Sequence, residues 1–119
     1  MTEVEKRTIA LAACIKKCSQ QREYAKAYER LCTQPDVLRQ VNRFRKRYFL
    51  ALGLENREER KHAVGQLEEE FSEVLSMSSV RDFLAAQQKL SVMMQEVYHI
   101  LDDAVNLDLG FMFEPEEEQ

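Results

Sequence analysis

The stretch VRDFLAAQQKLSVMMQEVYHILDDAV, residues 80–105, decides the fold class, because its apolar side chains recur at alternating four- and three-residue steps over three heptads. Such spacing places them on one side of a long α-helix. One antiparallel neighbouring helix in so small a protein would leave part of this side exposed to water. We therefore predict that a second copy or a partner protein covers the rest. The predicted interface residues are Val80, Phe83, Leu84, Leu90, Met93, Met94, Val97, Ile100 and Leu101.

The preceding segments show the same helical periodicity, interrupted by residues that are typical of helix ends. Thr2 and Glu5 have the spacing of a capping box, and Pro35 suits the first turn of a helix. Ser19 is a candidate N-cap, and residue 19 marks either a break or a kink. The remaining expected interruptions are residues 53–56 and a loop at residues 76–79, with Ser78 or Ser79 as the next N-cap.

The composition is that of a single helical domain. The chain has 119 residues, of which 45% are hydrophobic and 32% charged, with three Gly, two Pro and no Trp. Few glycines and prolines mean few breaks, and therefore few and long elements. We predict an all-α fold, an antiparallel helical hairpin or bundle over residues 1–109 with a long C-terminal helix, completed by dimerisation. Residues 110–119 are predicted to form an acidic C-terminal tail.

Charge is distributed unevenly along the chain. Residues 1–50 carry 12 Lys and Arg against 5 Asp and Glu, whereas residues 51–119 carry 5 against 16. The two halves attract each other, within one hairpin or between two copies packed head to tail. No stretch approaches the roughly 20 apolar residues of a membrane span, and the N-terminus lacks the apolar core of a secretion signal. We expect a cytoplasmic protein whose three cysteines, an odd number, are thiols.

The sequence contains no motif of a known catalytic site. It has no G-x-S-x-G elbow and no phosphate-binding glycine loop, and its histidines are not in an H-E-x-x-H arrangement. Cys14, Cys18 and Cys32 are the candidates for a metal site, but zinc and iron–sulfur sites usually need four ligands. The alternative is that Cys18, which falls on an apolar stripe, is buried as a small hydrophobe. We predict a protein with no enzymatic activity, no catalytic residues and no cofactor.

One basic strip stands out, and it consists of Arg39, Arg43, Arg45, Lys46 and Arg47, interleaved with aromatic residues. Several of these cations share a helix face and could meet the phosphates of a nucleic acid or an acidic helix. Alternatively, the acidic second half of the chain, or of a second copy, neutralises them. Direct nucleic-acid binding by this strip is therefore kept as the alternative to a protein-binding function.

The helical segments also carry a family resemblance. The run YAKAYERL at residues 24–31, followed by Pro35 and by VNRFR at residues 41–45, resembles the middle of the YlbF/YmcA family of bacterial proteins. VRDFLAAQ at residues 80–87, with MMQEV at residues 93–97, is similar to the final helix of that family. The resemblance spans about residues 8 to 109.

This resemblance implies an all-helical cytoplasmic regulator that dimerises and has no enzymatic activity. The better-known members regulate competence, sporulation and biofilm development within a complex that influences RNA processing, and some bind iron–sulfur clusters through C-terminal cysteines. This chain ends FEPEEEQ, residues 113–119, without a cysteine, so cluster binding is not carried over. Gln87 stands where the family leads us to expect an acidic residue. The predicted function is thus a regulatory adaptor that acts through self-association and protein partners, among them an RNA-processing complex.

Overall fold

The computed structural model describes residues 1–105 and 109–116, and within these ranges all regular structure is helical. The predicted all-α class is confirmed. The helices are α1 (Glu3–Lys17), α2 (Ser19–Cys32), α3 (Pro35–Leu52), α4 (Arg57–Glu70), α5 (Ser72–Leu75) and α6 (Ser78–Ala104), with a 3₁₀ turn η1 (Gly110–Phe113). The predicted division after residue 109 stays a prediction, and residues 117–119 of the predicted tail lie outside the described residues.

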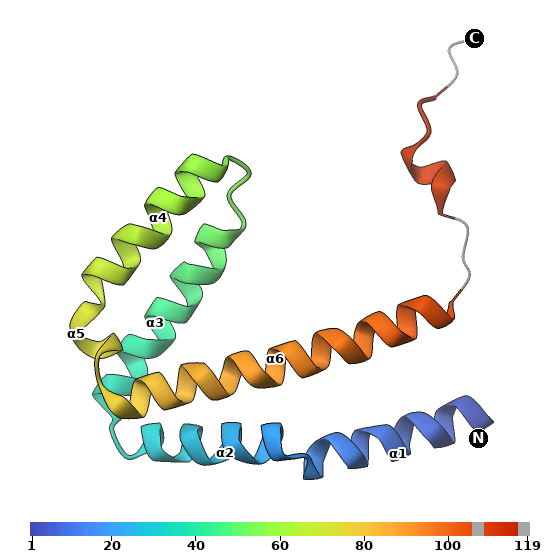
Figure 1. Ribbon diagram of the computed structural model, residues 1–119, viewed down its shortest axis with the longest axis horizontal. Helices are drawn as coiled ribbons and strands as arrows, with labels where there is room; N and C mark the ends of the chain where they lie inside the picture. The colour runs from blue at the N-terminus through green and yellow to red at the C-terminus, as the bar shows by residue number, and fades with distance from the viewer. Residues whose placement is uncertain (106–108, 117–119) are drawn as a thin grey trace.

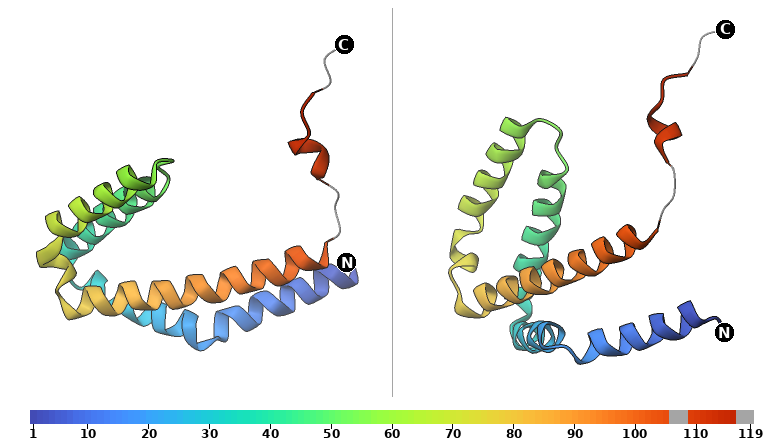
Figure 2. Two further views of the ribbon diagram at one scale, coloured as in Figure 1. Left: turned by 45° about the horizontal axis from the view of Figure 1, so that its top comes forward. Right: turned by 45° about the vertical axis from the view of Figure 1, so that its right-hand side comes forward.

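The helices form two arms that meet at one corner (Figure 1). The long arm comprises α1, α2 and α6, with α6 packed antiparallel on α2. The short arm comprises α3, α4 and α5, with α3 and α4 side by side. The radius of gyration is 19.6 Å, whereas a compact domain of this length has about 14 Å. Figure 2 shows from two further directions that the arms stay separate beyond the corner, so the chain alone leaves much helix surface without a neighbour.

The hydrophobic core lies at the corner, where the end of α2 meets α3, α5 and the start of α6. Phe83 and Val80 of α6 are completely buried there. The Phe83 ring lies 5.3 Å from that of Tyr24 and 6.2 Å from that of Tyr28, measured between ring centroids. The other members of the core cluster are Leu31, Val41, Phe44, Ala51, Leu67, Phe71 and Val74. The corner therefore holds the two arms together.

Local sequence signals explain where most helices begin. The Thr2 hydroxyl accepts a hydrogen bond from the Glu5 backbone N–H at 3.1 Å, and Pro35 occupies the first turn of α3, as predicted. The break between α1 and α2 falls one residue early, because Cys18 and not Ser19 is the N-cap. At residue 18 the backbone is extended, so this position is a break and not a kink. Likewise Met77, and neither predicted serine, precedes the first residue of α6.

Ion pairs connect the basic first half of the sequence with the acidic second half. Arg47 of α3 donates a hydrogen bond to the Glu70 carboxylate of α4 at 2.9 Å, and its second terminal nitrogen lies 2.8 Å from the other carboxylate oxygen. Arg30 of α2 pairs with Asp82 of α6 at 3.0 Å. Both pairs are largely exposed and contribute little to stability each. The attraction expected between the two halves thus operates within one chain, at contacts that fix how neighbouring helices face each other.

Candidate interaction surfaces

The first candidate surface is an apolar side of α1 that nothing in the chain covers. No residue of α1 is buried; Val4 and Leu11 share one side of the helix and are exposed, Val4 at 75% of its full surface, and Ile9 is exposed on the opposite side. The helix itself is well specified, because Thr2 caps it and Lys16 and Lys17 lie in its last turn. Its apolar side is therefore available to another chain.

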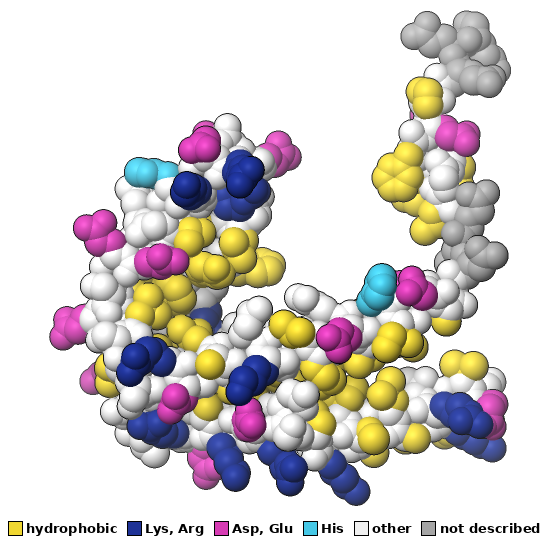
Figure 3. Space-filling model, viewed as in Figure 1, with side chains coloured by type: hydrophobic (Ala, Val, Ile, Leu, Met, Phe, Trp, Pro, Cys, Tyr) yellow, Lys and Arg dark blue, Asp and Glu magenta, His cyan; other side chains and the backbone are white. Residues whose placement is uncertain are grey.

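The second half of α6, from about Val92 to the helix end, extends this surface. The buried residues of α6, Ser79, Val80, Phe83 and Ala86, are all in its first half, and the start of α2 reaches only as far as Val92, Met93 and Glu96. Farther along, Tyr98, Ile100 and Leu101 are at least half exposed. We call the surface formed by α1 and this half of α6 the apolar face; Figure 3 shows hydrophobic side chains along both helices. Its exposed residues are Val4, Leu11, Ile100 and Leu101.

The structure divides the predicted interface residues of α6 between two roles. Val80 and Phe83 are fully buried in the core, so they have no surface to offer to a second chain. Leu84, Leu90, Met93, Met94 and Val97 are partly buried, while Ile100 and Leu101 are exposed. One continuous stripe therefore serves the core over its first half and faces outward over its second. Val80 and Phe83 are therefore removed from the predicted interface.

A second candidate surface is a groove at the inner side of the corner, between α3 and α6. We call it the inner groove; it has a volume of about 1230 Å³. Typical pockets for small molecules have about 300–1000 Å³, so this groove is large for such a ligand. Phe44, Tyr48, Phe49 and Leu84 give it apolar walls, and the hollow is visible in Figure 3. Its charged lining residues are Arg45, Lys46, Arg81 and Glu68.

Gln87 lines the inner groove from α6. Its side-chain oxygen is buried and accepts no hydrogen bond from any described residue. A buried acceptor without a donor costs roughly 1–3 kcal/mol. The groove wall therefore contains a buried acceptor that lacks a donor among the described residues.

The predicted basic strip does not form one continuous surface. Arg39 pairs with Asp36 on its own helix, and Arg47 turns toward Glu70 on α4. Arg45 turns toward α6, where its guanidinium lies 5.0 Å from the centre of the Phe83 ring, and it also donates to Asn42. Within the described part of the chain, only Arg43 and Lys46 of the strip lack a hydrogen-bonding partner.

The Arg47 guanidinium also affects the Glu70 carboxyl electrostatically. Its hydrogen bond holds the pKa of Glu70 below the ordinary value, and its charge and that of Arg43 add to the effect. The same contact raises the pKa of Arg47. The strip therefore acts in part as a structural connection between α3 and α4.

The sequence pattern of the family described as control of competence regulator ComK, YlbF/YmcA, matches residues 4–106. The chain belongs to this family. A curated relative, the UPF0342 protein STH1710 of Symbiobacterium thermophilum, is 27% identical over 107 residues, which cover 86% of this chain and 93% of that protein. None of the solved structures matches the chain. The family membership predicted from residues 24–45 and 80–100 is thus confirmed, and the family is one of regulatory control.

None of the three cysteines in this YlbF/YmcA-family chain is buried as a small hydrophobe. Cys14 and Cys32 are exposed, and Cys18 is half-buried, where its sulfur accepts from the Gln21 backbone N–H at 3.4 Å as the cap of α2. Cys32 raises the pKa of Tyr28, chiefly through a side-chain hydrogen bond. Residues 1–105 and 109–116 contain no group of three or more potential ligands arranged to hold a metal ion.

Sequence reasoning missed the inner groove of this YlbF/YmcA-family chain. The groove joins positions around residue 45 to positions around residue 88, and only the fold of the corner brings them together. The aromatic residues within the basic strip were the available signal. Separately, no helix in the described ranges combines the length and apolar character needed to cross a membrane.

Proposed function

We propose that this YlbF/YmcA-family protein is a non-enzymatic regulatory adaptor that self-associates through the apolar face and binds protein partners in the cytoplasm. The observation that carries the proposal is the apolar face itself, which extends over α1 and the second half of α6 without cover from the chain. Exposed apolar surfaces of this extent mark interaction sites.

Two other findings support a regulator. The family description refers to control of a competence regulator. The sequence also offers no nucleophile, paired carboxylates or glycine loop in a catalytic arrangement. The resemblance to YlbF and YmcA extends the proposal to partners in an RNA-processing complex.

The alternative, direct binding of nucleic acid, receives less support. Three of the five cations in the basic strip are engaged with Asp36, Asn42 or Glu70. A phosphate-binding surface needs cations that are free to neutralise phosphates. RNA binding measured over a salt series would reveal such a surface by a steep loss of affinity at high salt.

Sedimentation equilibrium over a concentration series tests self-association. We expect a dimer at micromolar concentration, and we expect Ile100→Glu to raise the dimer dissociation constant about 100-fold, because a charge is then buried on each side of the interface. Leu50→Glu is the matched control: Leu50 is similarly exposed, at 60% against 67%, but lies on α3 outside the apolar face. A wild-type protein that stays monomeric throughout the series would refute the proposal.

A further inference from the structure

We propose that the inner groove binds the C-terminal segment, residues 109–116, of a second copy of this chain, so that two copies exchange their tails. This inference rests on the proposed self-association and assigns a second contact within the same dimer. The occupant is identified by four observations: the chemistry of the segment, the charge of the groove, an unsatisfied acceptor on its wall, and the direction of α6.

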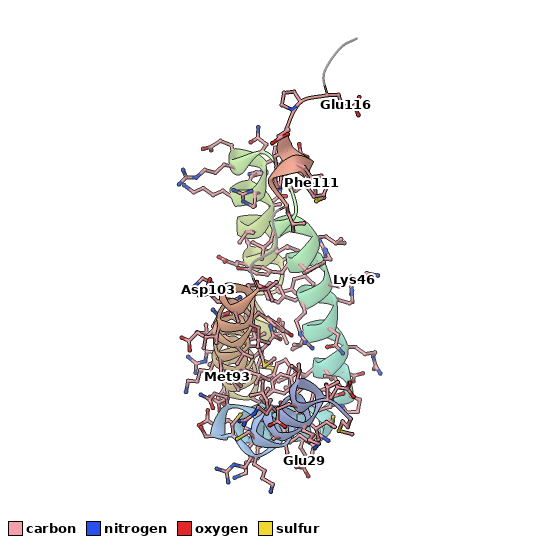
Figure 4. The ribbon with its side chains drawn as sticks, turned by 90° about the vertical axis from the view of Figure 1, so that its right-hand side faces the viewer. Glu29, Lys46, Met93, Asp103, Phe111 and Glu116 are labelled. Atoms are coloured by element: carbon pink, nitrogen blue, oxygen red, sulfur yellow. The ribbon has the colours of Figure 1, made fainter. Side chains whose placement is uncertain are left out.

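The C-terminal segment has the chemistry of a docking peptide. Phe111, Met112 and Phe113 are consecutive and all expose more than 60% of their surface, Phe113 as much as 86%. The acidic residues Glu114 and Glu116 follow at once. Figure 4 shows Phe111 and Glu116 beyond the end of α6. Two aromatic rings within one exposed 3₁₀ turn favour a site that removes them from water.

The inner groove complements this segment in shape and charge. Its walls include the aromatic rings of Phe44, Tyr48 and Phe49. Three cations, Arg45, Lys46 and Arg81, line it against the single carboxylate of Glu68. An apolar segment followed by carboxylates therefore meets apolar walls and an excess of positive charge.

The Gln87 side-chain oxygen supports a peptide as the occupant. It is buried on the groove wall and has no donor among the described residues. The segment is wound into a 3₁₀ turn at Gly110–Phe113, and when it extends in the groove it brings a backbone N–H at every residue except Pro115. One such group can satisfy the Gln87 oxygen once that side chain turns toward the groove.

The direction of α6 favours the tail of a second copy, and not the chain's own tail, as the occupant of the groove. In a two-fold dimer whose exposed stretches 92–101 pair antiparallel, Ala104 of one copy lies beside about residue 89 of the other. Lys89 itself faces Glu23 of α2, but its neighbours Gln88 and Ser91 line the α6 wall of the groove. The tail then enters the second copy's groove directly. To reach its own groove, the tail would have to reverse and run back about 20 Å along α6, at 1.5 Å per residue.

The segment also leaves α6 on the suitable side. In Figure 1 it departs toward the side of the long arm on which the short arm stands. The groove opens on this side, between α3 and α6. An antiparallel dimer whose two-fold axis runs along this direction thus presents each tail to the groove of the other copy.

A tryptophan reporter tests this proposal, because the chain contains no Trp. In the full chain carrying Phe111→Trp, we expect blue-shifted emission and protection from acrylamide above the dimer dissociation constant, both lost together on dilution. Adding Phe49→Glu with Lys46→Glu should abolish the shift and raise the dissociation constant about tenfold or more, because each dimer loses two docked tails. Leu50→Glu, which is adjacent but does not line the groove, should leave the shift intact.

Mixing two variants identifies which copy supplies the tail. One carries Phe111→Trp with the groove substitutions, and the other has an intact groove but carries Phe111→Ser with Phe113→Ser. Neither alone should show the shift, and mixing should restore it. A shift that persists in the monomer would overturn the proposal in favour of docking within one chain. Water-like emission in a proven dimer would overturn it while leaving self-association standing, whereas the absence of any dimer would refute the proposed function itself.

Discussion

Replacing Phe83 with Leu tests the assignment of this residue to the core of the chain. Phe83 is completely buried, with its ring centroid 5.3 Å from that of Tyr24 and 6.2 Å from that of Tyr28. The Arg45 guanidinium lies 5.0 Å from the ring centre on another side. Leucine keeps most of the apolar volume, which limits the packing cost, but it removes all three ring interactions. Aromatic pairs contribute about 0.5–1.5 kcal/mol each and an exposed cation–π contact about 0.5–1 kcal/mol, so we expect a loss of about 2–3 kcal/mol.

Urea unfolding followed by circular dichroism measures this loss, at one fixed protein concentration for all variants. Leu50→Ala is the exposed control, since Leu50 is 60% exposed and lies outside both the apolar face and the inner groove, so truncation there should cost less than about 0.5 kcal/mol. The assignment would be refuted if Phe83→Leu left the free energy of unfolding within about 1 kcal/mol of wild type while weakening self-association. That result would mean that Phe83 faces a second chain.

Two further predictions concern the short arm. Arg47 holds the pKa of Glu70 below its unfolded-state value, so the pair stabilises the fold at pH values above that unfolded-state pKa. This contribution disappears as the pH falls through the lower pKa of the folded state. Arg47→Met should therefore make the free energy of unfolding less sensitive to acid, measured by urea titrations from neutral pH to about pH 3. Asn56→Ala should cost about 1 kcal/mol in the same assay, because the Asn56 side chain accepts from the Glu58 and Glu59 backbone N–H groups at 2.8 Å and 3.0 Å. Asn56→Asp keeps the acceptor and should restore most of the stability; equal losses in both variants would contradict the capping role.

Signals that act over one turn of helix could be predicted from the sequence. Thr2 and Pro35 mark helix starts because a cap or a fixed φ acts on its own neighbours. The break at Phe71, which separates α4 from α5, carries no glycine or proline. Its ring is buried and lies 5.6 Å from that of Phe44, measured between centroids. There, packing between residues that are distant in sequence overrides the local preference for helix. The apolar periodicity of the sequence does not reveal this break.

The division of α6 into a covered and an uncovered half could not be predicted for a related reason. Phe83 and Leu101 occupy the same stripe and have equivalent spacing in the sequence. The difference arises because α2 has 14 residues and α6 has 27, so α2 covers only part of its neighbour. A hydrophobic pattern predicts that one face of a helix is buried. The lengths of the neighbouring helices decide whether the same chain or another chain buries it.

The apolar face and the stability of α1 are connected by the energetics of helix formation. α1 has 15 residues and buries none of them within the chain. Isolated helices of about 12–15 residues are marginal in water, because nucleation is costly and each added residue gains little. The Thr2 cap and the charges at both ends of α1 add about 1 kcal/mol each at most. Under the proposed self-association, the larger contribution comes from covering Val4 and Leu11, and the free energy that keeps α1 helical is then the same free energy that joins it to a second chain.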